Sequence, residues 1–243
     1  MNKLILILAL LIVFGCKYES QQSKKELVVC ISFDDNLRSV YDNALPIMNQ
    51  YGFRGTTYVN SGRIGYTKFC SWEQLTELKF DYHWEIGGHS LNHLHFATLT
   101  PTEVEYQISA DFDSLSQHGF KPVSFATPFG ECPTAYNPLV TKYYKNVRTT
   151  QNLPMHVPIN KELLGSYWVG NNYSPKSLIN RVTQGMADNE NLVIFMFHDL
   201  KPENPTNNIN NYDPEKFKQF LSGLHDMGVK VLPLNEALDY LED

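Results

Sequence analysis

The 243-residue chain has few cysteines, no run of basic residues and no apolar stretch long enough to cross a bilayer as a permanent helix. Its formal net charge of −6, together with the missing basic run, excludes nucleic acid as a partner. No internal repeat is visible. The longest apolar run, Leu4 to Phe14, is too short for a membrane span and is typical of an export signal.

Three domains or segments are expected. Residues 1–15 form a signal, and Cys16 after Gly15 resembles the cleavage site of a bacterial lipoprotein, so a lipid on Cys16 would anchor the exported protein to a membrane, in the periplasm or at the cell surface. An ordinary secretory signal cut elsewhere is the alternative. Residues 16–26 are polar and form a flexible tether. Residues 27–243 suffice for one large domain.

The cysteine count argues against a disulfide framework. If Cys16 carries lipid, the three that remain are Cys30, Cys70 and Cys132, and an odd number allows at most one bridge. Cys30 lies in an apolar segment and is expected in the core. For Cys132 a structural thiol is favoured over a soft metal ligand.

Two adjacent carboxylates, Asp34 and Asp35, follow an apolar run at residues 28–33. A short apolar run of this kind predicts a buried parallel strand, and catalytic groups gather where such strands end. The pair therefore indicates a metal ligand beside a base. The alternative is that Asp35 and Asn36 form a solvated turn and a helix cap.

Two histidines follow the next informative strand, at residues 85–88. His89 and His93 are four residues apart, about one helical turn, so a helix after Gly88 would place both on one face. With one carboxylate they would form an open metal site of two histidines and one aspartate. Incidental spacing of two surface histidines is the alternative.

These stretches resemble the motifs of polysaccharide deacetylases of carbohydrate esterase family 4, which share the NodB-homology fold. Residues 32–35 resemble the first motif and residues 89–93 the second, while residues 56–60, 64–65 and 71–75 are similar to the strand and helix between them. Residues 126–130 resemble the third motif, with Ala126 in place of its arginine. Residues 194–198 resemble the last motif. The fourth motif lacks its aspartate and keeps only Trp168.

The resemblance implies a role for each matching residue. Asp34 would be the base and His198 the general acid, and Asp35, His89 and His93 would bind one divalent ion, Zn²⁺ before Co²⁺ or Ni²⁺. The third-motif turn, Pro128 and Phe129, would stabilise the oxyanion through the Phe129 N–H. Met196 would line the acetyl pocket or simply fill core. Trp168 would stack on a sugar or pack in the interior. The remaining histidines, expected in structural or surface roles, are His83, His95, His118, His156 and His225.

Alternating apolar segments and helical patterns predict an α/β fold with a parallel sheet. Strands are expected near residues 28–33, 54–59, 84–87, 122–127, 145–149, 164–169, 192–197 and 229–233. Helices are expected to begin after Thr100, Ser174 and Asp213, each followed by proline. The resemblance sharpens this to a distorted (β/α) barrel of about seven strands, with the site at their C-terminal ends.

The predicted function is metal-dependent removal of N-acetyl groups from an amino-sugar polysaccharide. The alternatives are an O-acetyl glycan esterase of the same family and a lipoprotein that binds glycan without turnover. The resemblance implies that the third-motif arginine would lie beside the base. Because Ala126 cannot supply that guanidinium, we expect Asp34 to be held less firmly and to be more basic than in relatives with the arginine.

Overall fold

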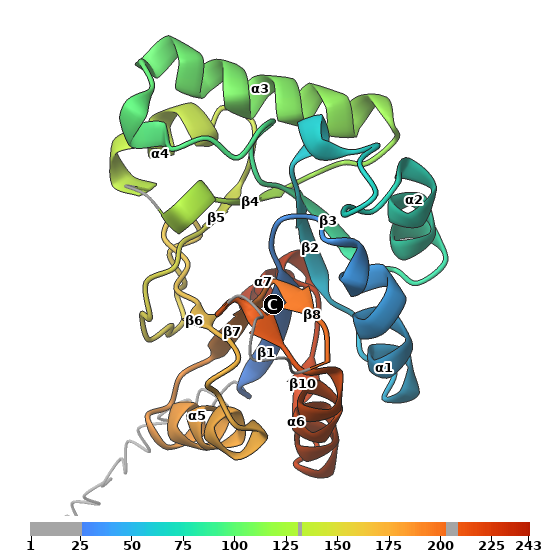
Figure 1. Ribbon diagram of the computed structural model, residues 1–243. Coiled ribbons are helices and arrows are strands. Elements are labelled where there is room, and N and C mark those ends of the chain that lie inside the picture. Colours follow the sequence, from blue (N-terminus) through green and yellow to red (C-terminus); the bar gives the residue numbers. More distant parts are fainter. Residues whose placement is uncertain (1–25, 131–132, 203–208) are drawn as a thin grey trace, which may run out of the picture.

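The computed structural model describes residues 26–130, 133–202 and 209–243, in which strands and helices alternate (Figure 1). The predicted signal, nearly all of the predicted tether, and Cys132 lie outside these ranges. The strands are β1 (Val28–Phe33), β2 (Thr56–Val59), β3 (Glu85–Gly88), β4 (Ser124–Ala126), β5 (Asn146–Arg148), β6 (Tyr167–Trp168), β7 (Leu192–Phe197), β8 (Asp199–Leu200), β9 (Asn211–Tyr212) and β10 (Lys230–Val231). The α-helices are α1 (Leu45–Gln50), α2 (Trp72–Phe80), α3 (Pro101–Gln117), α4 (Pro133–Val140), α5 (Pro175–Ala187), α6 (Pro214–Asp226) and α7 (Leu234–Glu242).

The strands form a curled parallel sheet. Seven of them follow the order β5-β4-β3-β2-β1-β7-β6, and β10 pairs with the start of β1. The segment leading into β6 touches both edges, because Leu164 bridges to Arg148 of β5 while Tyr167 and Trp168 pair with β7. The predicted fold, a distorted barrel of about seven parallel strands, is confirmed. The short parallel ribbon of β8 and β9 was not predicted, since two-residue strands leave no periodic signal.

The side chains of β1 alternate between two cores, as the period of a strand requires. Val29, Ile31 and Phe33 pack outward with the surrounding helices, whereas Val28 and Cys30 belong to an inner cluster with residues of α7. By the same alternation Asp34, the first residue after β1, points inward, and it is only 3% exposed. Cys30 is buried, as predicted, and both it and Cys70 are free thiols.

The predicted helix starts are confirmed. Side-chain oxygens of Thr100, Ser174 and Asp213 each accept a hydrogen bond from a backbone N–H in the first turn of α3, α5 and α6. Within the described part of the chain, no helix is long and apolar enough to cross a membrane.

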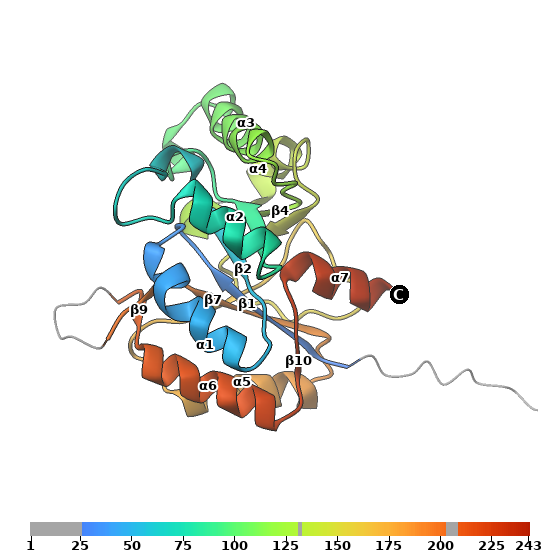
Figure 2. The same ribbon diagram turned by 90° about the vertical axis from the view of Figure 1, so that its right-hand side faces the viewer.

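Helix α7 begins differently. Its cap, Pro233, offers no side-chain acceptor, and the sheet supplies acceptors instead: Thr56 Oγ1 accepts from Leu234 N at 2.9 Å and Glu85 Oε2 from Asn235 N at 2.8 Å. Thr56 and Glu85 are the first residues of β2 and β3. Helix α7 therefore lies at the N-terminal end of the barrel, and β9 lies at the other end (Figure 2).

Candidate active site

The first part of the site is the carboxyl end of β1. Asp34 N donates to Phe197 O at 2.9 Å and Asn36 N to Tyr58 O at 3.1 Å, so the chain after β1 stays between β7 and β2. Asp35 and Asn36 both have left-handed backbone angles, with φ of 71° and 55°. Asp34 consequently points into the barrel mouth while Asp35 turns toward its rim. A turn does form at Asp35 and Asn36, but Asn36 is fully buried, so it is not the solvated turn weighed as an alternative.

The loop after β3 brings the two histidines together without a helix. The expected helical turn is wrong, because residues 89–95 are irregular and Ser90 and His93 have left-handed φ of 66° and 54°. His93 N donates to Ser90 Oγ at 3.1 Å, and Asn60 holds the loop through the carbonyls of His89 and Ser90. The predicted result, two neighbouring imidazoles with ring centroids 4.8 Å apart, is nevertheless found.

His89 is oriented for its Nε2 to act as a ligand. Its Nδ1 lies 2.7 Å from the Ala126 carbonyl oxygen, which accepts only if Nδ1 carries the proton. The Nε2 lone pair then faces the carboxylates, at 3.9 Å from both Asp34 Oδ2 and Asp35 Oδ1. Burial lowers the pKa of the His89 imidazole and, with His89 nearby, lowers that of His93 to about 4, so both rings are neutral near pH 7.

Asp35, His89 and His93 fit a metal ion. One ligand atom from each lies within 4.8 Å of the others, and the Asp35 Oδ1 to His93 Nε2 distance is 3.3 Å. Asp35 Oδ1 is buried and has no hydrogen-bond partner among the described residues, which is expected of an oxygen reserved for a cation. Two imidazoles and one carboxylate suit a first-row divalent ion and leave coordination positions open.

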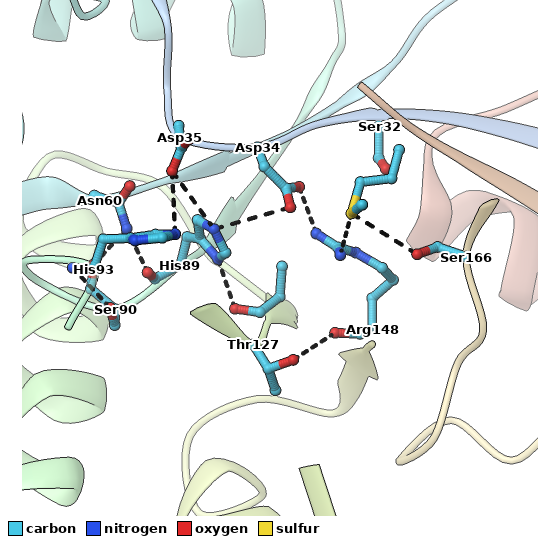
Figure 3. A network of polar contacts seen from close by, with 12 residues as sticks. Ser32, Asp34, Asp35, Asn60, His89, Ser90, His93, Thr127, Arg148 and Ser166 are labelled. Atoms are coloured by element: carbon cyan, nitrogen blue, oxygen red, sulfur yellow. Dashed lines mark hydrogen bonds and ion pairs between the residues drawn. The ribbon is translucent and has the colours of Figure 1, made fainter. Parts of the chain in front are cut away.

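Arg148 corrects the prediction that Asp34 lacks a cationic partner. Its Nη2 forms a short ion pair with Asp34 Oδ1, and both side chains are buried (Figure 3). In Figure 3 the guanidinium approaches Asp34 from the side opposite His89. Burial alone would raise the pKa of the Asp34 carboxyl, but the charge of Arg148, with smaller contributions from His89 and His198, outweighs it and lowers the pKa.

The position of Arg148 explains how it replaces the arginine missing from residue 126. It ends β5, and its register partner on β4 is Ala126 itself. The guanidinium lies 4.9 Å from the centroid of the Tyr58 ring, and its Nη1 lies 2.8 Å from Met196 Sδ. Sequence reasoning missed Arg148, because residues 145–149 contain only one apolar residue, Val147, and nothing in that stretch marks the arginine as buried.

His198, Phe129, Met196 and Trp168 line a cavity of about 260 Å³ together with the two acids and both histidines. His198 follows β7, and its Nδ1 is buried without a partner among the described residues. Met196 and Trp168 contribute to the cavity wall, whereas Pro128 is buried and does not line it. Met196 is also 2% exposed, so it fills core and faces the cavity at once.

An unpredicted residue, Asn210, holds Trp168 in the cavity wall. Trp168 Nε1 donates to Asn210 Oδ1 at 3.1 Å, and both residues line the cavity. Phe129 has a left-handed φ of 56° and a side chain that is 49% exposed. Its ring stacks on His95 at 3.6 Å and meets the edge of His93 at 4.3 Å, so His95 supports the cavity rim.

Two proteins are similar in sequence to part of the chain. A protein of Bacillus subtilis named as a polysaccharide deacetylase, YxkH, is 31% identical over 101 residues, 41% of this chain and 36% of that protein. A poly-beta-1,6-N-acetyl-D-glucosamine N-deacetylase of Staphylococcus epidermidis is 31% identical over 71 residues, 29% of this chain and 25% of that protein. The chain thus spans only about a third and a quarter of these relatives.

Solved structures share the fold over most of the chain. The Xyl-CE4 domain of a multidomain xylanase from the hindgut metagenome of Trinervitermes trinervoides superposes with a TM-score of 0.60 at 14% identity, covering 88% of this chain and 91% of that one. A family 4 acetyl xylan esterase of Clostridium thermocellum, solved with cobalt, gives 0.59 at 18% identity, covering 87% and 90%. The sequence profile of the polysaccharide deacetylases matches residues 21–151, more than half of the chain. The chain belongs to the polysaccharide deacetylase family.

Proposed function

We propose that this protein is a metal-dependent hydrolase that removes N-acetyl groups from an amino-sugar polysaccharide. The observation that carries the proposal is the juxtaposition of Asp34, ionised by its pair with Arg148, with the ligand set of Asp35, His89 and His93. The N-acetyl substrate is supported by the relative named for deacetylation of a poly-N-acetylglucosamine.

The ligand set suits Zn²⁺ best, with Co²⁺ or Ni²⁺ as substitutes, because imidazole and carboxylate are borderline ligands. A bound ion would polarise the acetyl carbonyl and lower the pKa of its water. Asp34, held ionised, would accept a proton from the water whose oxygen bonds to the acetyl carbon. His198 donates a proton to the sugar nitrogen as the bond to the acetyl carbon breaks.

The cavity walls suit an acetylated sugar. Met196 offers an apolar surface in the cavity wall for the acetyl methyl, and Trp168, held by Asn210, offers an aromatic face for a pyranose ring. The backbone N–H of Phe129, in the turn after β4, is assigned to the developing oxyanion.

Two alternatives have different support. An O-acetyl esterase would use the same groups, and the resemblance to xylan esterases concerns the fold only. A glycan-binding protein without turnover was suggested by the missing third-motif arginine and the missing fourth-motif aspartate. Arg148 removes the first reason, and the second, the missing fourth-motif aspartate, stands.

Substitution of the two proton carriers tests the proposal. Asp34→Asn and His198→Ala should bind zinc as the parent does but lose roughly a hundredfold or more in acetate release, because general acid and base contributions are of that order. Asp113→Asn, at an exposed position of α3, is the matched control and should be unchanged. Parental rates in a folded variant would remove that residue from the mechanism.

A further inference from the structure

Helix α3 presents two buried polar side chains to the loop that carries both histidines. Gln107 and Asp111 are 4% and 0% exposed and lie one helical turn apart, beside the buried apolar residues Val104, Ile108 and Leu115 of α3. Burying polar groups is unfavourable unless each is hydrogen-bonded. Their hydrogen bonds lead mainly to two loops, the one after β3 that carries both histidines and the one after β2 that begins beside Ser61.

Asp111 joins those two loops through one carboxylate. Its Oδ2 accepts from His89 N at 3.1 Å and lies 3.5 Å from the Tyr144 hydroxyl. Its Oδ1 accepts from Ser61 N at 2.9 Å and from Ser61 Oγ at 2.6 Å. All four neighbours are donors, so only a group with acceptors on both sides satisfies them.

Gln107 holds the middle of the same loop. Its backbone carbonyl accepts from Leu91 N at 2.9 Å, and its side-chain Oε1 accepts from Asn92 N at 2.9 Å. These bonds fall between the two ligand histidines, where Ser90 and His93 have left-handed backbone angles. Such angles are unfavourable for residues other than glycine and persist only where neighbours impose them.

Gly88 makes room for this arrangement. A Cβ at that position would lie 2.9 Å from Asp111 Oδ2 and closer still to the Tyr144 hydroxyl. A side chain at residue 88 would therefore push Asp111 away from the His89 N–H.

We propose that Gln107 and Asp111 are positioning residues that set metal affinity, by holding residues 89–93 in the conformation that brings both imidazoles onto Asp35. The inference rests on the proposed metal-dependent function and adds to it a support provided by α3. Neither residue would touch the ion. Mutation of a group that hydrogen-bonds to a metal ligand without touching the ion commonly lowers metal affinity by about 10- to 100-fold.

The test uses two variants and one matched control. Asp111→Asn turns an NH₂ group toward donors on one side, and Gln107→Met removes the acceptor for Asn92 N at similar length. Ser61→Ala removes one bond to Asp111 but leaves the bond to His89. The zinc dissociation constant is measured by competition with a chromophoric chelator at about pH 8, above the Asp111 pKa of about 7. Urea unfolding of each metal-free variant is measured in parallel.

We expect zinc affinity to fall roughly tenfold or more in Asp111→Asn and several-fold in Gln107→Met, in keeping with other groups that support ligands. Ser61→Ala should lose stability without losing zinc affinity. If Asp111→Asn does not fold, the zinc affinity of Gln107→Met alone tests the inference.

Parental zinc affinity in the folded variants would overturn the inference and leave the proposed function intact. An equal loss in Ser61→Ala would overturn it too, because general loosening would then explain the effect. A parent that binds no zinc would instead remove the proposed function, and this inference with it.

Discussion

At the scale of single residues, the ion pair of Arg148 and Asp34 defines the chemistry of the site. A buried carboxylate would ordinarily favour its neutral form, which cannot accept a proton. The guanidinium reverses this preference and lowers the Asp34 pKa, so the base is ionised well below neutral pH. The ion pair also fixes the carboxylate, leaving Oδ2 toward His89.

Arg148→Met should expose this dependence. Without the guanidinium the Asp34 pKa rises, so the acidic limb of the pH–rate profile should move upward by about 1–3 pH units. Turnover near neutral pH should fall and partly recover at higher pH. The control is Arg181→Met, which breaks another largely buried ion pair, with Glu190, away from the site. It should lower stability and leave the profile in place.

The register of β4 and β5 permits a second test of the role of Arg148. Ala126→Arg placed in an Arg148→Ala background would send a guanidinium to the same region from the neighbouring strand. We expect the double variant to move the acidic limb back toward that of the parent. An acidic limb that is the same in the parent and in folded Arg148→Met would contradict the role of Arg148.

At the scale of elements, the strand ends were predictable and the loops between them were not. Apolar segments closed by Asp34, His89 and His198 located the site because parallel strands end at one edge. The prediction of a helical turn at residues 89–93 was wrong, because a spacing of four residues fits a loop held by distant residues as well as it fits a helix. The role of Arg148 was not predicted for a related reason. Its contact with Asp34 depends on the β4 and β5 register, which no local pattern encodes.

The hydrogen bonds between the sheet and the start of α7 give a prediction about stability. Thr56→Val removes the hydroxyl that accepts from Leu234 N and donates to Glu85, so it should cost about 1–3 kcal/mol of unfolding free energy. Thr57→Val is the matched control, because the Thr57 hydroxyl is buried without a partner among the described residues. Its loss should leave stability unchanged or raise it. Urea unfolding measures both, and a Thr56→Val variant as stable as Thr57→Val would show that the sheet does not cap α7.

At the scale of the whole molecule, the sequence predicted the barrel because its helix starts and buried strands agree with one another. Export and anchoring stay proposals, since the predicted signal at residues 1–15 lies outside the described residues. If Cys16 carries lipid, the protein should partition with membranes in its native host, and Cys16→Ser should accumulate uncleaved or appear in the soluble fraction. Equal partitioning of both forms into the aqueous phase would indicate a plain secretory signal.

The central claim is that a metal ion held by Asp35, His89 and His93 works with Asp34 to release acetate from an N-acetylated glycan. The most direct measurement is acetate release from poly-N-acetylglucosamine, with mass analysis of the product and acetylated xylan as the O-acetyl comparison. We predict one free amine for each acetate released, loss of release with a chelator, and recovery when zinc is restored. Folded, zinc-loaded protein that releases no acetate from the N-acetylated polymer, or that releases it equally well with the chelator present, would contradict the account.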